Sequence, residues 1–327
     1  MAVYTHLGAE RLAQLIAYYD VGELVSAKGI AEGVSNSNWL VETSGGVGAD
    51  ENARYILTMY ERRIAIADLP FFLDLLDHLS AKGCPVPATI HDREGASHRL
   101  VDGKAVALIE FLPGVSVDHP TPEQARSVGR ALAQMHLASE DYPGRRPNDL
   151  RPPDWQALFD RCGPEALASI DESLPDAVAR AMPRLLADWP EDLPHTVIHA
   201  DLFPDNVLMR GDDVSGLIDF YFACHDIAAY DLAVTHAAWC FTDTGGRLLP
   251  EISAALLAGY SERRALSKAE RDALPLLAQG AAMRFVATRA FDWIDTPEDA
   301  LVTRKDPMAF LRRAQFYAQE GMRVFGA

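Results

Sequence analysis

The stretch Val197-Ile-His-Ala-Asp-Leu-Phe-Pro-Asp-Asn-Val-Leu-Met-Arg-Gly-Asp-Asp-Val-Ser-Gly-Leu-Ile-Asp219 places polar residues at the ends of short apolar runs. The first run predicts a strand that delivers His199 and Asp201, and a short loop then ends at Asn206. The apolar flanks of the following Gly/Asp turn favour a hairpin that leads to Asp219. Phosphoryl transfer needs one carboxylate to orient the attacking hydroxyl, and an amide oxygen and a second carboxylate to hold magnesium. Asp201, Asn206 and Asp219 are of these types.

The length and charge of the chain limit the classes of partner. Its 327 residues suffice for two lobes with a core each, and 30 basic residues against 47 acidic ones give a formal charge of −17. Such an excess of acid disfavours nucleic acid and anionic membranes as partners. It leaves a small-molecule substrate open, because a site can be locally basic on an acidic protein.

The cysteines and the N-terminus predict a cytoplasmic location. The cysteines are widely spaced, without a C-x-x-C pair or clustered histidines, which disfavours a zinc site or a disulfide scaffold. The first residues lack a basic segment followed by an apolar run, and no apolar run approaches the roughly 18 residues of a spanning helix. We therefore expect a cytoplasmic protein with reduced thiols.

The first third of the chain predicts antiparallel strands with one inserted helix. Helical spacing marks residues 9–19, and strand patterns follow from Val25 and at 55–60, around a polar loop at 32–38. Backbone N–H groups of such a loop can cover nucleotide phosphates, although the pattern by itself favours a plain hairpin turn. Residues 69–81 predict a helix, and Asp102-Gly103 predicts a two-residue hairpin.

Beyond Pro113-Gly114 the pattern becomes helical. Helices are expected at about 155–189, 226–241, 250–260, 268–293 and 307–320. Capping boxes begin at Thr121 and Ser267, each followed three residues later by Gln or Glu. A domain boundary is therefore expected near residue 113.

The polar stretch resembles a known family at this point. His199-Ala-Asp201-Leu-Phe-Pro-Asp-Asn206, followed by Leu217-Ile218-Asp219-Phe220, resembles the catalytic and metal-binding segments of the aminoglycoside-phosphotransferase-like small-molecule kinases. Further stretches are similar to the bacterial homoserine kinases of this fold: Ala31–Asn38, Leu57–Glu61, Asp68–Leu73, Ala133–Ser139 and Ile218–Ala223. The similarity runs in chain order from about residue 1 to 320.

The resemblance implies an α+β, two-lobed protein-kinase-like fold. Residues 1–112 would form a nucleotide-binding lobe with a small antiparallel sheet, and residues 113–327 a mainly helical lobe for catalysis and substrate binding. ATP would lie between the lobes, with Mg²⁺ as the second cofactor. The implied nucleotide-binding residues are Gly33, Ser35, Asn36, Ser37, Asn38, Glu110 and Leu112.

The same resemblance assigns roles within the polar stretch. Asp201 would be the catalytic residue that takes the proton of the substrate hydroxyl, and Asn206 and Asp219 would be the metal ligands. His199 is interpreted as support that orders the loop. As isolated residues, Asp201 would read as a cap or turn residue, Asn206 as an Asx-turn and Asp219 as a strand-end cap.

One position departs from the usual kinase pattern. Nucleotide kinases commonly place a Lys or Arg on the strand corresponding to residues 55–60, and the matching residue here is Thr58. Arg62, Arg63 or Lys28 would have to supply the missing charge, and the sequence does not distinguish among them.

The implied substrate is L-homoserine, phosphorylated on its side-chain hydroxyl. Its carboxylate calls for a forked Arg contact, for which Arg284 and Arg289 are candidates, and Asp292 is a candidate for the amine. Ordinary ion pairs explain each of these residues equally well. Another amino alcohol on the same fold (an aminoglycoside, choline or ethanolamine) and a catalytically silent nucleotide-binding protein are the competing hypotheses.

Overall fold

The computed structural model describes residues 7–30, 36–45, 53–61, 65–296 and 304–326, and it divides into two compact units. Unit 1 comprises Met1–Gly114 with Ser215–Tyr221, and unit 2 comprises Val115–Val214 with Phe222–Ala327. The polar stretch therefore contributes to both units, because Asp201 and Asn206 lie in unit 2 and Asp219 lies in unit 1.

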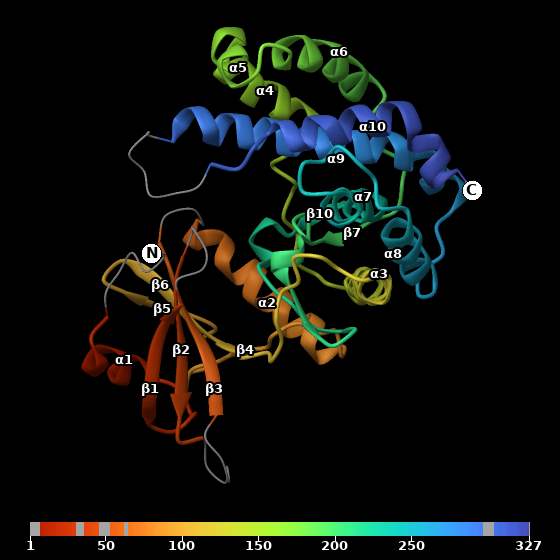
Figure 1. The fold of residues 1–327 in the computed structure, drawn as a ribbon. Helices are drawn as coiled ribbons and strands as arrows, with labels where there is room; N and C mark the ends of the chain where they lie inside the picture. Colours follow the sequence, from red (N-terminus) through yellow and green to blue (C-terminus); the bar gives the residue numbers. More distant parts are fainter. Residues whose placement is uncertain (1–6, 31–35, 46–52, 62–64, 297–303, 327) are drawn as a thin grey trace. The chain divides into compact units, whose positions relative to one another are not determined.

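Unit 1 is built on an antiparallel sheet whose strands follow the order β1-β2-β3-β6-β4, with β5 paired to β6 (Figure 1). The strands are β1 (Leu24–Ile30), β2 (Asn36–Thr43), β3 (Ala53–Tyr60), β4 (Thr89–Ile90), β5 (Arg99–Val101) and β6 (Lys104–Glu110). The predicted hairpin at Asp102-Gly103 is confirmed, and φ is +52° and +80° at these residues. Positive φ at both central positions is what a type I′ turn requires.

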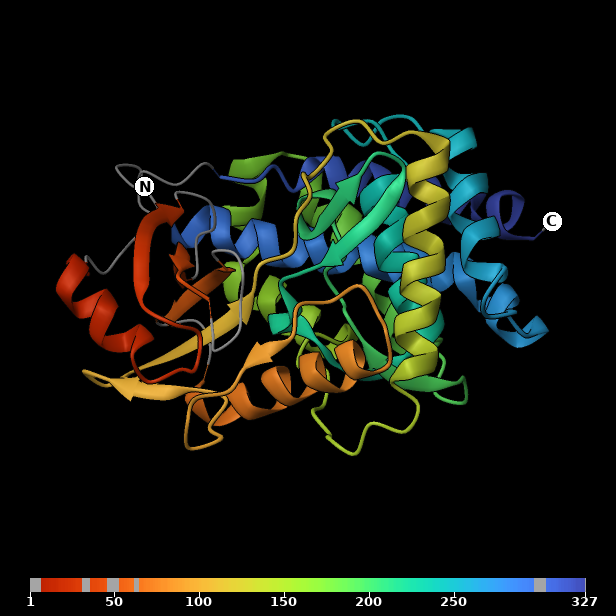
Figure 2. The ribbon, with the colours of Figure 1, turned by 90° about the horizontal axis from the view of Figure 1, so that it is seen from below.

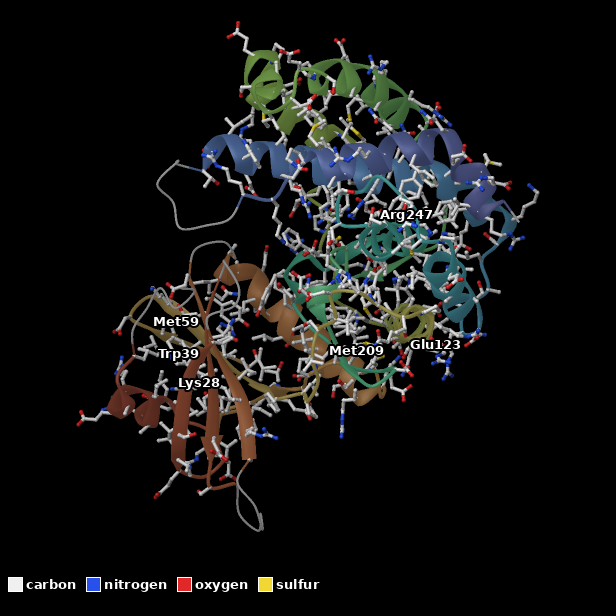
Figure 3. All side chains as sticks on the ribbon, viewed as in Figure 1. Lys28, Trp39, Met59, Glu123, Met209 and Arg247 are labelled. Atoms are coloured by element: carbon white, nitrogen blue, oxygen red, sulfur yellow. The ribbon has the colours of Figure 1, made fainter. Side chains whose placement is uncertain are left out.

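Successive side chains along each strand point to opposite faces of the sheet, and both faces carry apolar residues. One face packs on α1 (Ala9–Ile16) and carries Trp39 and Met59, which Figure 3 labels on the sheet. The opposite face packs Tyr60 against α2 (Leu69–Ala81), whose bounds are those predicted. Because residues two apart share a face, Thr58 lies on the α2 face with Tyr60.

Unit 2 is mainly helical, and its long helices α9 and α10 run alongside each other (Figure 1). Its helices are α3 (Pro122–Ala138), α4 (Pro152–Cys162), α5 (Pro164–Ile170), α6 (Leu174–Ala187), α7 (Ala228–Trp239), α8 (Pro250–Ser261), α9 (Lys268–Asp295) and α10 (Met308–Phe325). Both predicted capping boxes are present, at the starts of α3 and α9. The helical segment predicted at 155–189 is divided into three helices, and Gly163 adopts φ +75° at the first break. Among the described residues, no helix is long and apolar enough to cross a membrane.

Two glycines let α3 and α8 approach closely, and the helices lie side by side in Figure 2. A Cβ at Gly129 would lie 2.2 Å from the carbonyl oxygen of Leu256, and one at Gly259 would lie 2.0 Å from that of Arg126. No heavy atom tolerates such distances, so the backbone separation of these helices depends on glycine at both positions.

Two short ribbons carry the polar stretch. The pairing of β8 (Val207–Arg210) with β9 (Asp213–Leu217) confirms the hairpin around the Gly/Asp turn. The preceding strand β7 (His195–Ile198) instead pairs antiparallel with β10 (Cys224–Ile227), which the sequence analysis did not predict. The loop that holds His199 and Asp201 therefore leaves the end of β7 beside the start of β10.

A buried histidine joins three helices of unit 2. His236 on α7 is fully buried, with Nδ1 2.6 Å from the hydroxyl of Tyr317 on α10 and Nε2 2.7 Å from that of Ser253 on α8. Burial lowers the pKa of His236 from 6.5 to about 3, so the ring stays neutral in the folded protein.

This burial predicts acid sensitivity. The folded-state pKa is below the unfolded one, so the stabilisation is complete above pH 6.5 and is lost as the pH falls toward the folded pKa of about 3. At pH 5 we expect His236 to lower the free energy of unfolding by about 2 kcal/mol relative to pH 8. Urea unfolding of His236→Asn at both pH values should show that this part of the pH dependence is gone. The exposed His119→Asn should keep it, and equal pH dependence in both variants would contradict the assignment.

Candidate active site

The catalytic loop comprises residues 199–206, which connect β7 to β8 within unit 2. His199 and Ala200 are buried and Asp201 is half-buried, so the Asp201 side chain reaches the edge of the buried region. The backbone N–H of Phe203 donates to the carbonyl of Asp201 at 2.8 Å, and the indole of Trp239 donates to the carbonyl of Leu202 at 2.9 Å. These contacts fix the backbone that follows the Asp201 side chain.

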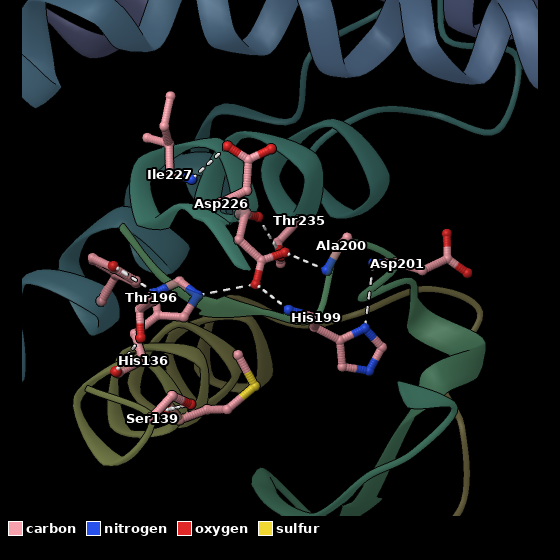
Figure 4. Close-up of polar contacts among 12 residues, drawn as sticks. His136, Ser139, Thr196, His199, Ala200, Asp201, Asp226, Ile227 and Thr235 are labelled. Atoms are coloured by element: carbon pink, nitrogen blue, oxygen red, sulfur yellow. Dashed lines mark hydrogen bonds and ion pairs between the residues drawn. The ribbon is translucent and has the colours of Figure 1, made fainter. Parts of the chain in front are cut away.

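A buried carboxylate on α7 holds the start of this loop. Asp231 is fully buried and accepts the backbone N–H groups of His199 at 2.7 Å and Ala200 at 2.8 Å. Its Oδ2 atom also lies 2.9 Å from Nε2 of His136 on α3, whose Nδ1 lies 2.8 Å from the hydroxyl of Tyr260 on α8. Figure 4 shows His136, His199 and Ala200 arranged around these contacts.

The Asp231 carboxylate is ionised despite its burial. Burial by itself raises its pKa, but the hydrogen bond and charge of His136, the charge of His199 and the backbone N–H of His199 together hold the pKa below 3.8. A buried ion is stable only when its lone pairs are satisfied, and three contacts, from His136 on α3 and from the backbone of His199 and Ala200, do this.

Ala200 adopts a backbone conformation that alanine disfavours. Its φ is +63°, in the left-handed region, which costs an L-residue about 1 kcal/mol or more. Both polar groups of the residue have charged partners, because its N–H donates to Asp231 and its carbonyl accepts from the guanidinium of Arg284 on α9. These contacts offset the strain and set the direction in which the chain presents Asp201.

The electrostatic environment makes Asp201 a better proton acceptor. Burial raises the pKa of its carboxyl, and the positive charges of Arg284, His199 and Lys305 partly oppose the increase. The net shift of the pKa is upward from 3.8, which increases the affinity of the carboxylate for a proton.

Asn206 is oriented by the loop it closes. Its Nδ2 atom donates to the carbonyl of Asp201 at 2.8 Å and lies 3.4 Å from the Asp201 carboxylate. With the amide nitrogen committed to Asp201, Oδ1 is the side-chain atom that can accept or ligate. A neutral oxygen beside a carboxylate suits Mg²⁺, which prefers oxygen ligands and keeps several waters. Among the described residues no group of three or more His, Cys, Asp or Glu could hold a metal, so an all-protein cage is absent there.

Asp219 lies in unit 1, after β9. Like Ala200 it is a non-glycine residue in the left-handed region, with φ +66°. Nearby, the hydroxyl of Tyr221 donates to that of Tyr60 at 3.2 Å. Burial raises the pKa of Tyr60 and the Asp219 charge adds to this, so the hydroxyl stays protonated. The Asp219 carboxylate therefore has two neutral phenol groups, those of Tyr60 and Tyr221, among its neighbours in unit 1.

Of the nucleotide-binding residues predicted in the polar loop at 32–38, some lie within the described residues and some do not. Gly33 and Ser35 lie outside the described residues, as do Arg62 and Arg63. Asn36 and Asn38 begin β2 and pair with Tyr60 and Thr58 across the α2 face of the sheet. Asn38 Oδ1 accepts from the Thr58 hydroxyl at 2.8 Å, and Asn36 Oδ1 is buried without a hydrogen bond.

Ser37 points to the other face of the sheet. Its hydroxyl donates to Glu61 at 2.7 Å, and Glu61 also pairs with Lys104. Lys104 shares the α1 face with Val106, opposite Thr58, so this lysine does not take the place of the cation missing at Thr58. Lys28 pairs with Leu40 in the ladder, on the face of Thr58, and its side chain is exposed.

Glu110 is the last residue of β6, and Leu112 follows it by two residues. The backbone N–H of Glu110 donates to the carbonyl of Ala88 at 2.9 Å, and its carboxylate accepts the N–H of Ala88 at 3.1 Å. An adenine requires one acceptor and one donor on adjacent backbone, which the carbonyl of Glu110 and the N–H of Leu112 would supply.

The predicted substrate residues occupy three different environments. Arg284 is 2% exposed and donates to the carbonyl of Ala200. Arg289 is half-buried beside the catalytic loop, with its guanidinium 6.0 Å from the centre of the Phe203 ring. Asp292 is exposed. Only the first two therefore lie against the loop that carries Asp201.

A cavity of about 460 Å³ in unit 2 opens at the same loop. Its lining includes three carboxylates and no Lys or Arg, so it favours a cationic group. The lining residues are Ser116, Val117, Asp118, His119, Pro204, Asp205 and Asp243.

Sequence reasoning missed two side chains beneath the loop, His136 and Tyr260. His136 is 95 residues from Asp231 in the chain, and Tyr260 is a further partner from α8. The only available signal was a histidine among apolar residues in the stretch 133–139, which by itself is more often a satisfied core histidine.

The sequence pattern of the phosphotransferase enzyme family matches residues 26–266. The homoserine kinase of Caulobacter sp. (strain K31) is 48% identical over 328 residues, covering 100% of this chain and 99% of that protein. The homoserine kinase of Gluconobacter oxydans (strain 621H) is 47% identical over 319 residues, covering 97% of this chain and 98% of that protein.

Solved structures share the fold. A spectinomycin phosphotransferase in complex with ADP and spectinomycin has a TM-score of 0.70 at 15% identity, covering 97% of this chain and 99% of its own. A microcompartment-associated aminopropanol kinase has a TM-score of 0.66 at 20% identity, covering 97% of this chain and 98% of its own. The predicted α+β, protein-kinase-like fold is thus confirmed. Together with the full-length sequence matches, these similarities show that the chain belongs to the homoserine kinases of the phosphotransferase enzyme family.

Proposed function

We propose that this protein is an ATP-dependent kinase that phosphorylates the side-chain hydroxyl of L-homoserine to give O-phospho-L-homoserine, a step toward threonine. The observation that carries the proposal is 48% identity to a homoserine kinase along the whole chain. The catalytic loop supports it independently, because Asp201 and Asn206 are held in one oriented pair. We place the activity in the cytoplasm, where ATP is available.

Asp201 is the proposed catalytic residue. It accepts a hydrogen bond from the homoserine hydroxyl, whose oxygen forms a bond to the γ-phosphorus while the bond to the β–γ bridging oxygen breaks and ADP leaves. The hydroxyl proton passes to the Asp201 carboxylate. Because the transition state is loose, the main contribution of Asp201 is orientation, and its raised pKa assists the final proton transfer.

Asn206 and Asp219 are the proposed Mg²⁺ ligands. They offer one neutral and one anionic oxygen, and magnesium normally completes its shell with phosphate oxygens and water. When bound, Mg²⁺ neutralises charge that develops on the β- and γ-phosphates. His199 is the proposed support, because its N–H is held by Asp231 and its Nδ1 accepts the N–H of Asp201 at 3.3 Å.

A substrate panel tests the function. ADP release is measured with Mg·ATP and L-homoserine, choline, ethanolamine or kanamycin, and the product is identified by ³¹P NMR. We expect kcat/KM for L-homoserine to exceed the others by at least about 100-fold, equivalent to about 3 kcal/mol of selectivity. Removal of Mg²⁺ with EDTA should abolish turnover, and added Mg²⁺ should restore it. Turnover confined to choline or kanamycin would contradict the proposal.

A further inference from the structure

Two arginines of α9 face different directions. Arg284 and Arg289 are five residues apart, which at 3.6 residues per turn separates their side chains by about 140° around the helix axis. The structure gives them different surroundings: Arg284 is 2% exposed, whereas Arg289 is half-buried. This difference indicates different tasks.

Arg284 is enclosed by the protein. Its guanidinium donates to the carbonyl of Ala200 and lies 4.8 Å from the centre of the Phe285 ring and 5.4 Å from that of Phe222. A side chain that is almost fully buried and bonded to the backbone is not accessible to a ligand. Its contact with Ala200 makes it a positioning residue for the catalytic loop.

Arg289 is flanked by aromatic rings but has few hydrogen-bond acceptors. Its guanidinium lies 4.4 Å from the centre of the Phe310 ring and 6.0 Å from that of Phe203. Within the described residues it makes one hydrogen bond, from Nη1 to the carbonyl of Asp306 at 3.2 Å. A guanidinium has five N–H donors in a planar fork, so most of them are left for another partner.

Arg289 lies beside the catalytic loop, which carries Asp201. Phe203, over which the guanidinium lies, follows Asp201 by two residues and donates its N–H to the Asp201 carbonyl. Burial, with the nearby charge of Arg313, lowers the pKa of Arg289 to about 10, and the charges of Asp201, Asp306 and Asp205 act in the opposite direction. The group is a cation at neutral pH that is partly desolvated and would gain from an anion.

We propose that Arg289 binds the α-carboxylate of the substrate and thereby selects amino alcohols that carry one. This inference rests on the proposed homoserine kinase activity. Four bonds separate the carboxylate carbon of homoserine from its hydroxyl oxygen, a span of about 5 Å. A receptor for the carboxylate must therefore lie close to Asp201, and Arg289 lies beside Phe203, two residues further along the same loop. Arg fits the planar carboxylate with two parallel hydrogen bonds, which a lysine does not provide.

The test compares L-homoserine with 3-aminopropan-1-ol, the same molecule without its carboxylate. For Arg289→Met we expect kcat/KM for L-homoserine to fall roughly 10- to 100-fold, because a charge-assisted hydrogen-bond pair is lost. The kcat/KM for 3-aminopropan-1-ol should change less than about threefold. Arg289→Lys, which keeps the charge but not the fork, should show an intermediate loss for L-homoserine alone.

Calorimetric titration measures substrate binding directly, so it depends neither on turnover nor on activity with 3-aminopropan-1-ol. Arg289→Met should raise the Kd of L-homoserine by the same factor, and the Kd of Mg·ATP should stay within about threefold of wild type. Unchanged Mg·ATP binding also shows that the variant is folded. An unchanged Kd for L-homoserine would overturn the proposal.

Two matched variants distinguish carboxylate binding from other effects. Arg284→Met, on the same helix, should lower kcat for both substrates by equal factors because it acts through the loop. Lys305→Met removes an exposed charge that acts on Asp201, and it should leave the ratio of kcat/KM for L-homoserine to kcat/KM for 3-aminopropan-1-ol unchanged. The proposal is wrong if Arg289→Met lowers kcat/KM equally for L-homoserine and 3-aminopropan-1-ol. It is also wrong if Lys305→Met, instead of Arg289→Met, changes the ratio of these two kcat/KM values. If the wild type does not phosphorylate L-homoserine at all, the proposed function itself fails.

Discussion

Asp201→Asn is expected to lower kcat by about three orders of magnitude, within the range of 10²- to 10⁴-fold typical for loss of a positioned base. The asparagine keeps the size of the side chain and can still accept one hydrogen bond, but it cannot take the hydroxyl proton. The Kd of Mg·ATP should remain within about threefold of wild type, because the proposed metal ligands are Asn206 and Asp219. Steady-state kinetics with calorimetric titration of Mg·ATP measures both quantities.

The neighbouring carboxylate provides the control. Asp205 lies on the same loop, is exposed, and accepts a hydrogen bond from Ser116 through its backbone carbonyl rather than its side chain. Asp205→Asn should therefore reduce kcat by less than about tenfold. Wild-type turnover in Asp201→Asn, or an equal loss in the two variants, would exclude Asp201 as the catalytic residue.

Asp231→Ala should cost about 3–5 kcal/mol of folding stability, the range observed when one partner of a buried ion pair is removed. The substitution leaves the N–H groups of His199 and Ala200 without their acceptor and removes the partner of His136. Urea unfolding followed by circular dichroism measures the loss. Asp231→Asn, which still offers one acceptor oxygen, should lose less.

Two observations would test the Asp231 assignment further. Asp188→Ala breaks only an exposed pair with Arg184 at 3.6 Å and should change stability by less than about 1 kcal/mol. Because the folded-state pKa of Asp231 lies below 3.8, its stabilisation is present above that pH and is lost as the pH falls through the folded value. Unfolding of Asp231→Ala should therefore depend less on pH in acid. A variant with wild-type stability would mean that the carboxylate does not hold the loop.

Local sequence signals predicted much of the fold. The helix at 69–81 and the hairpin at Asp102-Gly103 follow from spacing and turn chemistry, which act over a few residues. Both capping boxes were predicted for the same reason. The division of 155–189 into three helices depends on breaks at Gly163 and near Asp171, where a helical average over the region hides the interruption.

The residue types of the candidate site were predicted, with His199 as support, but the contacts between distant segments that hold the loop were not. Asp201, Asn206 and Asp219 stand out in the chain because their neighbours are apolar. By contrast, the β7–β10 pairing and the His136–Asp231 contact join segments that are far apart in the chain. The two strands are too short to show a hydrophobic periodicity of their own, so the sequence does not predict these contacts. Nothing in the identity of Ala200 predicts a left-handed φ, which follows from the charged partners on both of its peptide groups. The sequence likewise could not rank Arg284 and Arg289, because their burial is a property of the packed helix.

The left-handed backbone conformation of Ala200 makes the orientation of Asp201 depend on a local conformational equilibrium. The residue keeps this conformation only while α7 and α9 present Asp231 and Arg284 to its N–H and carbonyl. We expect that a small shift of either helix would let Ala200 relax toward an ordinary backbone conformation and turn Asp201 away from the substrate, while the core of unit 2 stays folded. Regions of a protein open with different free energies, and functional loops are often among the least stable. On heating, the enzyme should therefore stop turning over at a temperature below that at which its helices melt.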